Sequence, residues 1–598
     1  DPDTIFEAHN VAFEISIWRN IIVKRYGWPD IPNERWRDSM AAACYYALPA
    51  ALDRLSRVLG FEGKDGDGGR LITKYSKLHL KTAKKIIPQE DLARFVAYCK
   101  QDVEVERKVS KFLGPLPKRE QEIFLMDLEI NLRGLEIDQA GIDQATAIVE
   151  RRAAELEAEF VKLTGVRPTQ RDKCLAWFRA RGIDLPDMKA ETLEEFVEEM
   201  EGGFDHNARR ALAIRLQVNK ASTKKLDAMS RQRDEDGRAR FQSRYHGAAT
   251  GRETGSGFQP LNLSRGFDKM DPAQLVRDIG YGDPEWLDLI YGDALNAVAK
   301  ATRYWIKAKP KHRIMAGDFV SIEAVVLACL AGEQWKVDAF TNKVKIYEAM
   351  ADKIYKLPQG TVTKDTHPAE RQDGKTAELA FGYQGALNAW LNFDSSGRHS
   401  DERIIEICKA WRSEHPMTTK LWRKLEEAAI DAVLHPGRVT GYREVEFEVI
   451  DDWLSMRLPD GKRIWYWRPE VRMGMPQWHK PREDEDCATG ECDCKPQPKL
   501  SYMAQKFGKW CRVTTYGGKL AENLTQATSR QLLTPAMLRV RKARYPIVLS
   551  VYDEIVAEVP EGFGSTKEFE ELLADCPGDW ARGWPIGVDV WQGNRYKK

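Results

Sequence analysis

Two acidic segments and one basic segment carry the residues that could do chemistry in this 598-residue chain. The first acid, Asp318, ends a short run that predicts a strand, and an apolar helix is predicted to begin near Ser321. Asp553 and Glu554 lie between two β-branched runs, which predict a hairpin with these acids at its tip. Residues 371–383, between the two acidic segments, predict a basic helix. Carboxylates from separate strands, with cations on the other side, are the parts that two-metal nucleotidyl transfer requires.

The three segments resemble motifs of one enzyme family. Residues 318–323 (Asp-Phe-Val-Ser-Ile-Glu) resemble motif A of the family A (DNA polymerase I-like) DNA polymerases, residues 371–383 motif B, and residues 552–554 (Tyr-Asp-Glu) motif C. The resemblance covers nearly the whole chain and is greatest to the bacteriophage members. It implies a template-directed DNA polymerase, a nucleotidyltransferase that adds dNTPs to a primer 3′-hydroxyl in phage genome replication.

The implied fold is a multidomain combination of α+β and α/β parts, a right-hand polymerase of palm, fingers and thumb preceded by an RNase H-like exonuclease-type domain. At 598 residues the chain is too long for one core, in agreement with several domains. The expected segments are a partial exonuclease-like domain (1–112), linker and thumb (113–240), the first palm part with motif A (241–335), fingers with motif B (336–440), and the second palm part with motif C and a Cys-containing insertion near 480–497 (441–598).

Composition limits the partners. A formal net charge of +1 means that contacts with nucleic acid must come from local basic patches. No apolar run reaches the roughly 18 residues of a membrane span, so we expect no membrane partner. The cysteines are mostly single in the sequence, which indicates reduced thiols in a cytosol. We therefore expect a cytoplasmic location, in the bacterial host if the chain is phage-encoded. We also expect a monomer.

The resemblance implies catalytic roles for the acids. Asp318 and Asp553 would ligate two Mg²⁺ ions about 3.5–4 Å apart, which Mn²⁺ can replace. Glu554 is expected to tune the site beside the primer end without being a constant ligand. Tyr552 stands where the family usually has His, so it can hydrogen-bond near the primer end but cannot carry a positive charge there.

The basic helix is expected to bind the incoming dNTP together with Glu323 of motif A. Arg371, Lys375, Leu379 and Tyr383 are four residues apart and fall on one stripe of a helix. Arg371 and Lys375 would neutralise the triphosphate, and Lys375 is the candidate for protonating the pyrophosphate. Tyr383 would abut the templating base, or alternatively be a packing aromatic. Leu379 stands where relatives usually carry Phe or Tyr, which leaves discrimination against dideoxy sugars open.

Two further blocks resemble the segments that lie along the primer–template. The first block is a Thr-Gly-Arg followed by a Gln-Pro-Leu-Asn stretch. The second block, residues 509–526, resembles the helix that lays polar side chains along the primer duplex in this family. Short polar side chains on a glycine-rich loop suit close approach to phosphates and groove edges. With motif C, the expected primer–template residues are Arg252, Gln259, Asn262, Asn523, Gln526 and Tyr552.

Three residues near the N-terminus resemble parts of a 3′–5′ exonuclease. Glu14 matches its second motif, and Tyr98 and Asp102 match the Tyr-x-x-x-Asp of the third on one helix face. The family's first Asp-x-Glu strand has no counterpart before residue 10, so we expect little or no proofreading by this chain. A scaffold domain without activity is the alternative.

A cysteine cluster lies in the expected insertion. Cys487, Cys492 and Cys494 could hold a structural Zn²⁺ with His479 as a distant fourth ligand. The Cys-x4-Cys-x-Cys spacing is unusual for zinc and acids crowd it, so we favour an acidic surface insertion. Two other functions remain open for the chain as a whole, a dedicated 3′–5′ exonuclease and a non-catalytic nucleic-acid-binding scaffold, although neither explains both Asp318 and Asp553.

Overall fold

The computed structural model describes residues 1, 3–61, 66–76, 86–199, 205–220, 223–267, 271–475 and 496–597. Its centre is a four-stranded antiparallel sheet in the order β14-β15-β7-β16. The strands are β7 (His312–Phe319), β14 (Ile547–Val551), β15 (Glu554–Pro560) and β16 (Val588–Gly593). The strand at Asp318 and the hairpin at Asp553 are both confirmed, and β15 pairs directly with β7.

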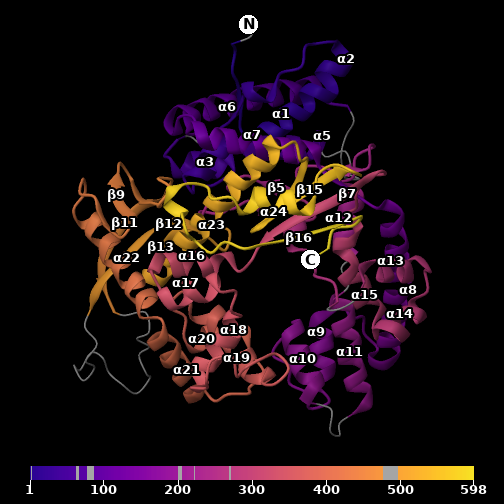
Figure 1. The fold of residues 1–598 in the computed structure, drawn as a ribbon. Coiled ribbons are helices and arrows are strands. Elements are labelled where there is room, and N and C mark those ends of the chain that lie inside the picture. The colour runs from indigo at the N-terminus through magenta and orange to yellow at the C-terminus, as the bar shows by residue number, and fades with distance from the viewer. Residues whose placement is uncertain are drawn as a thin grey trace.

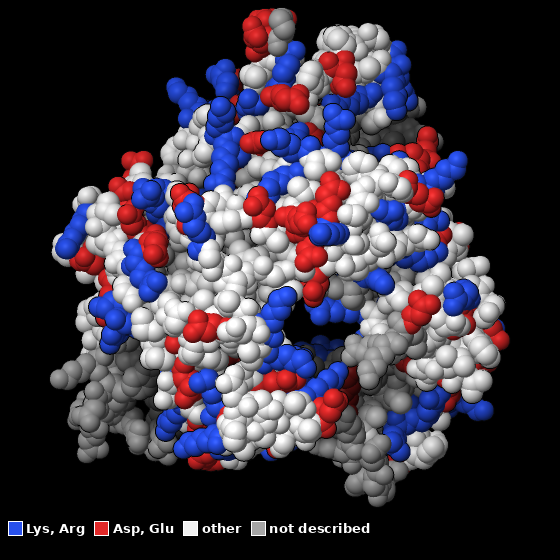
Figure 2. Space-filling view, in the orientation of Figure 1, with Lys and Arg blue, Asp and Glu red and all other residues white. Residues whose placement is uncertain are grey.

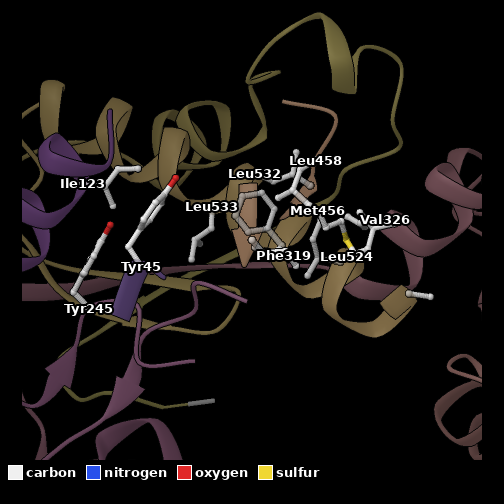
Figure 3. Packing of buried hydrophobic residues seen from close by; sticks show 14 of the residues in the cluster. Tyr45, Ile123, Tyr245, Phe319, Val326, Met456, Leu458, Leu524, Leu532 and Leu533 are labelled. Carbon is white, nitrogen blue, oxygen red and sulfur yellow. The ribbon is translucent and has the colours of Figure 1, made fainter. Parts of the chain in front are cut away.

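The central sheet separates two hydrophobic cores. Alternate residues of β7 face opposite sides, so Met315 belongs to one core and Ile314 and Ala316 to the other. Helices α23 (Gly517–Lys542) and α24 (Thr566–Ala574) pack on the sheet, and a Cβ at Gly317 would lie only 2.5 Å from Leu573 of α24. Figure 3 shows aromatic and aliphatic side chains of the larger core, including Phe319.

Two groups of helices project from the sheet and leave an opening between them (Figure 1). One group packs around the smaller core. It comprises α8 (Gln139–Thr164), α9 (Arg171–Arg179), α10 (Ala190–Glu199), α11 (His206–Lys220), α12 (Thr223–Arg231), α13 (Pro272–Gly280), α14 (Pro284–Tyr291) and α15 (Ala294–Ala301). The other comprises α16 (Ile322–Ala331), α17 (Gln334–Thr341), α18 (Ile346–Tyr355), α19 (Pro368–Phe381), α20 (Leu387–Phe393), α21 (Asp401–Glu414) and α22 (Pro416–Leu434). Helices α13 and α15 pack against α8, although they follow it by more than 100 residues.

A second sheet lies beside the second helical group. Its six strands follow one another as an antiparallel meander: β8 (Thr440–Tyr442), β9 (Val445–Ile450), β10 (Trp453–Arg457), β11 (Arg463–Gly474), β12 (Gln497–Lys506) and β13 (Lys509–Thr514). Residues 509–514 are therefore a strand, and the helix expected within 509–526 begins only at Gly517.

The N-terminal part is mainly helical. It contains β1 (Phe6–Ala8), α1 (Val11–Ile17), α2 (Lys24–Tyr26), β2 (Trp36–Asp38), α3 (Ser39–Tyr45), α4 (Leu52–Val58), α5 (Gly66–Tyr75) and α6 (Gln89–Leu113). Within its described residues the sheet has two parallel strands, β1 and β2. Helix α7 (Lys118–Arg133) connects it to the rest, and the short strands β3 (Leu135–Glu136), β4 (Arg238–Ala239), β5 (Ser243–Arg244) and β6 (Thr254–Gly255) follow.

A buried cluster of charges joins α7, α23 and the turn between β10 and β11. Lys462 Nζ lies 2.8 Å from Glu120 Oε1, and Arg530 lies 3.5 Å from Glu120 and 3.2 Å from Glu253. The Arg530 side chain is completely buried. Burial and the neighbouring cation Lys462 hold the pKa of His246 well below its usual value, so this histidine is neutral.

Arg530→Met is expected to destabilise the fold by about 3–5 kcal/mol, because it leaves the buried Glu120 and the largely buried Glu253 with one cation fewer. Thermal unfolding followed by circular dichroism measures this change. Arg541→Met is the matched control, since Arg541 pairs with Glu129 nearer the surface, where such pairs contribute about 0–1 kcal/mol. Equal melting temperatures for the two variants would contradict a structural role of the buried cluster.

Candidate active site

The acidic residues meet at one edge of the central sheet. Asp318 is the next-to-last residue of β7, Asp553 lies in the two-residue turn between β14 and β15, and Glu554 begins β15. The backbone N–H of Phe319 donates to the carbonyl of Asp553 at 3.0 Å, and Glu554 lies opposite Asp318 in the strand register. Residues more than 230 positions apart are thus neighbours, as the sequence predicted.

Glu554 differs from the two aspartates in its surroundings. It is completely buried, and its Oε2 accepts a hydrogen bond from Tyr596 Oη at 2.5 Å. Burial, and next the charge of Glu554, raise the pKa of Tyr596 well above its usual value, so the phenol stays protonated and donates. Asp318 and Asp553 are partly exposed. The two partly exposed carboxylates can therefore meet a ligand, whereas the carboxylate of Glu554 is enclosed by the protein.

Asp589 is a fourth acid at this edge, and the sequence reasoning missed it. It lies on β16, directly opposite Asp318 in the register, and is exposed. Neighbouring residues in an antiparallel register share a face of the sheet, so Asp589 lies on the side of Asp318. The one sequence signal is its place between two β-branched residues, Val588 and Val590.

The tip of the hairpin contacts a loop from a different part of the chain. Tyr552 has a left-handed backbone (φ 52°), and its hydroxyl donates to Asn262 Oδ1 at 3.0 Å. Asn262 in turn lies 3.5 Å from Gln259 through their side chains, and its carbonyl accepts from Lys225 Nζ of α12 at 2.6 Å. Three of the expected primer–template residues are therefore in one contact network beside Asp553.

Helix α19 carries the predicted cations. Arg371 lies in its first turns, where the helix dipole adds positive potential, and its Nε is 3.3 Å from Glu348 Oε1. Lys375 is half-buried and has no hydrogen-bond or ion-pair partner among the described residues. Leu379 is exposed. A cation without a protein partner can bind an anionic ligand without first breaking an ion pair.

Tyr383 is the exception to the predicted helical stripe, and that part of the prediction was wrong. Helix α19 ends at Phe381, and Tyr383 lies in the turn that follows. Tertiary contacts end the helix: Trp422 Nε1 donates to the carbonyl of Gly382 at 3.1 Å, and a Cβ at Gly518 would lie 2.3 Å from the carbonyl oxygen of Tyr383. The close approach of α23 therefore fixes where Tyr383 lies.

Glu323 connects Tyr383 to the opposite side of the site. Its Oε2 accepts from Tyr383 Oη at 3.1 Å, and its Oε1 lies 2.7 Å from Arg252 Nη2. Burial, and next the charge of Glu323, raise the pKa of Tyr383 well above its usual value, so this phenol also stays protonated. Motif A, motif B and the Thr-Gly-Arg block thus meet at one carboxylate, which no sequence spacing indicated.

The two expected residues on α23 also have protein partners. Asn523 is buried and donates to Tyr466 Oη at 3.2 Å. Gln526 donates to Glu522 at 3.3 Å and lies 3.5 Å from the Thr250 hydroxyl. Gln526 is therefore beside the loop that carries Arg252.

The exonuclease-like residues lie in the N-terminal part. Glu14 is on α1, and burial raises its pKa. Tyr98 and Asp102 are on α6, one turn apart as predicted, and Tyr98 is buried. Their adjacency on one helix is confirmed; an exonuclease role stays a prediction.

The possible zinc ligands Cys487, Cys492 and Cys494, with His479, lie outside the described residues. Within the described ranges, no group of three or more His, Cys, Asp or Glu residues has an arrangement that could hold a metal ion.

The central edge offers the oxygen donors of Asp318 and Asp553. Mg²⁺ is commonly bound by one or two carboxylates together with substrate phosphates, so this donor set fits Mg²⁺.

Lys and Arg side chains border the opening between the two helical groups, with Asp and Glu side chains among them (Figure 2). A carboxylate-bearing sheet edge beside an opening with cations at its rim, with helical groups on both sides, defines the class of right-hand nucleic-acid polymerases. None of the helices in the described ranges is long and apolar enough to cross a membrane.

Comparisons with known proteins agree with this class. A DNA polymerase of Bacillus phage SP02 is 32% identical over 609 aligned residues, which cover 99% of this chain and 89% of that protein. The solved POL domain of Pol1 from M. smegmatis, in complex with DNA primer-template and dNTP, has the same fold with a TM-score of 0.59 at 14% identity, covering 100% of this chain and 87% of that one. No family model matches the chain. The chain belongs to the family A (DNA polymerase I-like) DNA polymerases of bacteriophage type.

Proposed function

We propose that this chain extends a primer 3′ end on a DNA template by adding dNTPs, in the replication of a phage genome. The observation that carries the proposal is the adjacency of Asp318, near the end of β7, and Asp553, in the turn that leads into the neighbouring strand β15. Neither a dedicated exonuclease nor a non-catalytic scaffold needs two partly exposed carboxylates at this edge.

Asp318 and Asp553 would hold two Mg²⁺ ions through their carboxylate oxygens, together with the backbone carbonyl of Phe319. When bound, these ions would lower the pKa of the primer 3′-hydroxyl and stabilise the charge of the leaving pyrophosphate. Glu554 would keep the edge in place through its hydrogen bond with Tyr596, and would act on the site without binding the ions constantly.

Arg371 and Lys375 would bind the triphosphate from the side opposite the carboxylates. Because Lys375 has no partner among the described residues, it is the group that can deliver a proton to the pyrophosphate. Tyr383 would lie against the nascent base pair, held by Glu323, and the exposed Leu379 would line the sugar side of the same pocket.

The primer–template would lie along Arg252, Gln259, Asn262, Asn523, Gln526 and Tyr552. Contacts between the hairpin tip, the 259–262 loop and α12 support this assignment, because one strand could touch all three at once. In domain terms we propose a palm built on the central sheet, fingers in 336–440 and a thumb in 113–240. We also propose that the protein works as a monomer in the host cytosol.

Tyr552→Phe is expected to weaken primer–template binding about 2- to 10-fold, because it removes one hydrogen bond, which contributes roughly 0.5–1.5 kcal/mol, and frees Asn262. Fluorescence anisotropy with a labelled primer–template measures the affinity. Tyr26→Phe changes the same hydroxyl on an exposed residue far from the site and should bind as wild type does. An unchanged affinity in Tyr552→Phe would remove Tyr552 from the primer–template contacts.

A primer-extension assay tests the proposed function. With a recessed primer, the protein should add only the nucleotide complementary to the first template base, and only when a divalent ion is present. Shortening of the primer without extension would favour the exonuclease. Tight DNA binding with neither reaction would favour the scaffold.

A further inference from the structure

A groove of about 630 Å³ opens beside the proposed active site. Its walls are residues 44–50 of the N-terminal part, the loop 244–250, strands β11–β13 and the first turns of α23. In Figure 1, β12 and α23 are drawn below α3, the helix that leads into residues 44–50. The six-stranded sheet is therefore one wall of a cavity as well as support for the fingers.

A strained turn presents an aromatic ring at the mouth of this groove. Lys506 pairs with Lys509 in the register of β12 and β13, which leaves Phe507 and Gly508 as a two-residue turn. Both have left-handed backbones, with φ 49° and 75°, as in a type I′ turn. Glycine adopts that conformation readily, whereas it is unfavourable for a bulky residue such as phenylalanine. Phe507 is 94% exposed, so no packing among the described residues accounts for its conformation.

Two lysines flank the turn that carries this ring. Lys506 Nζ lies 5.7 Å from the ring centroid of Phe507, and Lys509 is the residue opposite Lys506. Arg54 Nη1 of α4 donates to the carbonyl of Gly508 at 3.0 Å, so the turn is held against the N-terminal helices. An exposed ring between lysines on a fixed turn is the combination that binds unpaired nucleic acid by base stacking and phosphate contacts.

The inner end of the groove lies next to Tyr383. The backbone N–H of Gly518 donates to Gln384 Oε1 at 2.9 Å, and Lys519, the next residue, lines the groove. Asn523 and Gln526 line it as well. If Tyr383 abuts the nascent base pair, the primer ends at that point and only the template strand continues into the groove.

We propose that this groove binds the unpaired template strand ahead of the nascent base pair, with a template base stacked on Phe507 and phosphates beside Lys506 and Lys509. The proposal rests on the proposed function. It assigns the six-stranded sheet and the N-terminal helices a shared role in holding single-stranded DNA.

Template overhang length provides the test. Kd values are measured for two primer–templates that share a duplex and carry either one or eight unpaired template nucleotides. Wild type should bind the long overhang more tightly, and Phe507→Ala should lose roughly 5- to 100-fold in affinity for it, the loss of one stacked base. Binding of the one-nucleotide overhang should not change. Lys506→Gln/Lys509→Gln should in addition reduce the salt dependence of long-overhang binding by about 1.4 in the log–log slope.

Tyr281→Ala removes another exposed aromatic side chain, on the thumb side, and should leave both affinities unchanged. Equal losses of affinity for the two overhangs in Phe507→Ala would overturn the proposal. An unchanged affinity for both overhangs in Phe507→Ala would also overturn it, and would assign the turn to a protein partner. Single-nucleotide addition on the primer–template with the one-nucleotide overhang distinguishes a failure of the groove proposal from a failure of the proposed function. Its absence in wild type would contradict the polymerase activity, whereas its presence in Phe507→Ala shows that the variant is folded and active.

Discussion

Asp553→Asn is expected to lower the rate of primer extension by at least about 1,000-fold while leaving duplex binding nearly intact. The substitution keeps the size of the side chain and removes one of the two negative charges that we propose hold the metal ions. Metal ions at such sites stabilise transition-state charge by several kcal/mol, and each 1.36 kcal/mol corresponds to a tenfold change in rate. Asp318→Asn should have a similar effect, because Asp318 lies beside Asp553 on the neighbouring strand.

Single-turnover incorporation and DNA affinity are to be measured on the same preparations. Asp451→Asn is the matched control: Asp451 is exposed in the turn between β9 and β10, and its left-handed backbone (φ 50°) suits asparagine equally well. Extension by Asp553→Asn or Asp318→Asn at a rate close to that of the control would show that the catalytic site is elsewhere. A parallel loss of DNA affinity would instead indicate a disturbed fold.

The parts of the site that local sequence dictates were predictable. An acid that ends an apolar run and acids between two β-branched runs identify a strand end and a hairpin tip, because alternation and turn chemistry act over a few residues. The order of these segments then indicated that Asp318 and Asp553 meet. The cationic face of α19 followed in the same way from a four-residue spacing.

Features set by tertiary contacts were not predictable. The end of α19 before Tyr383 depends on Trp422 and on the glycine backbone of α23, which lie about 40 and 135 residues away. The register that places Asp589 opposite Asp318 depends on the pairing of the last strand with β7. The contacts of Glu323 also depend on the tertiary fold, because its two partners, Tyr383 and Arg252, come from separate segments. A spacing rule that assumes a continuous helix fails wherever another element ends it.

Lys375→Ala is expected to slow the chemical step of nucleotide addition by roughly 100-fold or more, the usual contribution of a positioned proton donor. The negative charge that Lys375 offsets grows as pyrophosphate leaves, so the effect should fall on the rate at saturating dNTP more than on dNTP affinity. The melting temperature should not change, because Lys375 has no ion pair or hydrogen bond in the described part of the protein.

Single-turnover incorporation over a range of dNTP concentrations separates the two effects. Lys409→Ala removes an exposed lysine from α21 of the same helical group and should behave as wild type. Lys375→Arg keeps the charge but donates a proton poorly, since the guanidinium does not deprotonate in proteins. It should therefore restore dNTP affinity more fully than rate. If Lys375→Arg and Lys375→Ala lose rate equally and both bind dNTP as wild type does, Lys375 acts as a proton donor alone; if Arg restores the rate completely, its role is electrostatic and the proton comes from elsewhere.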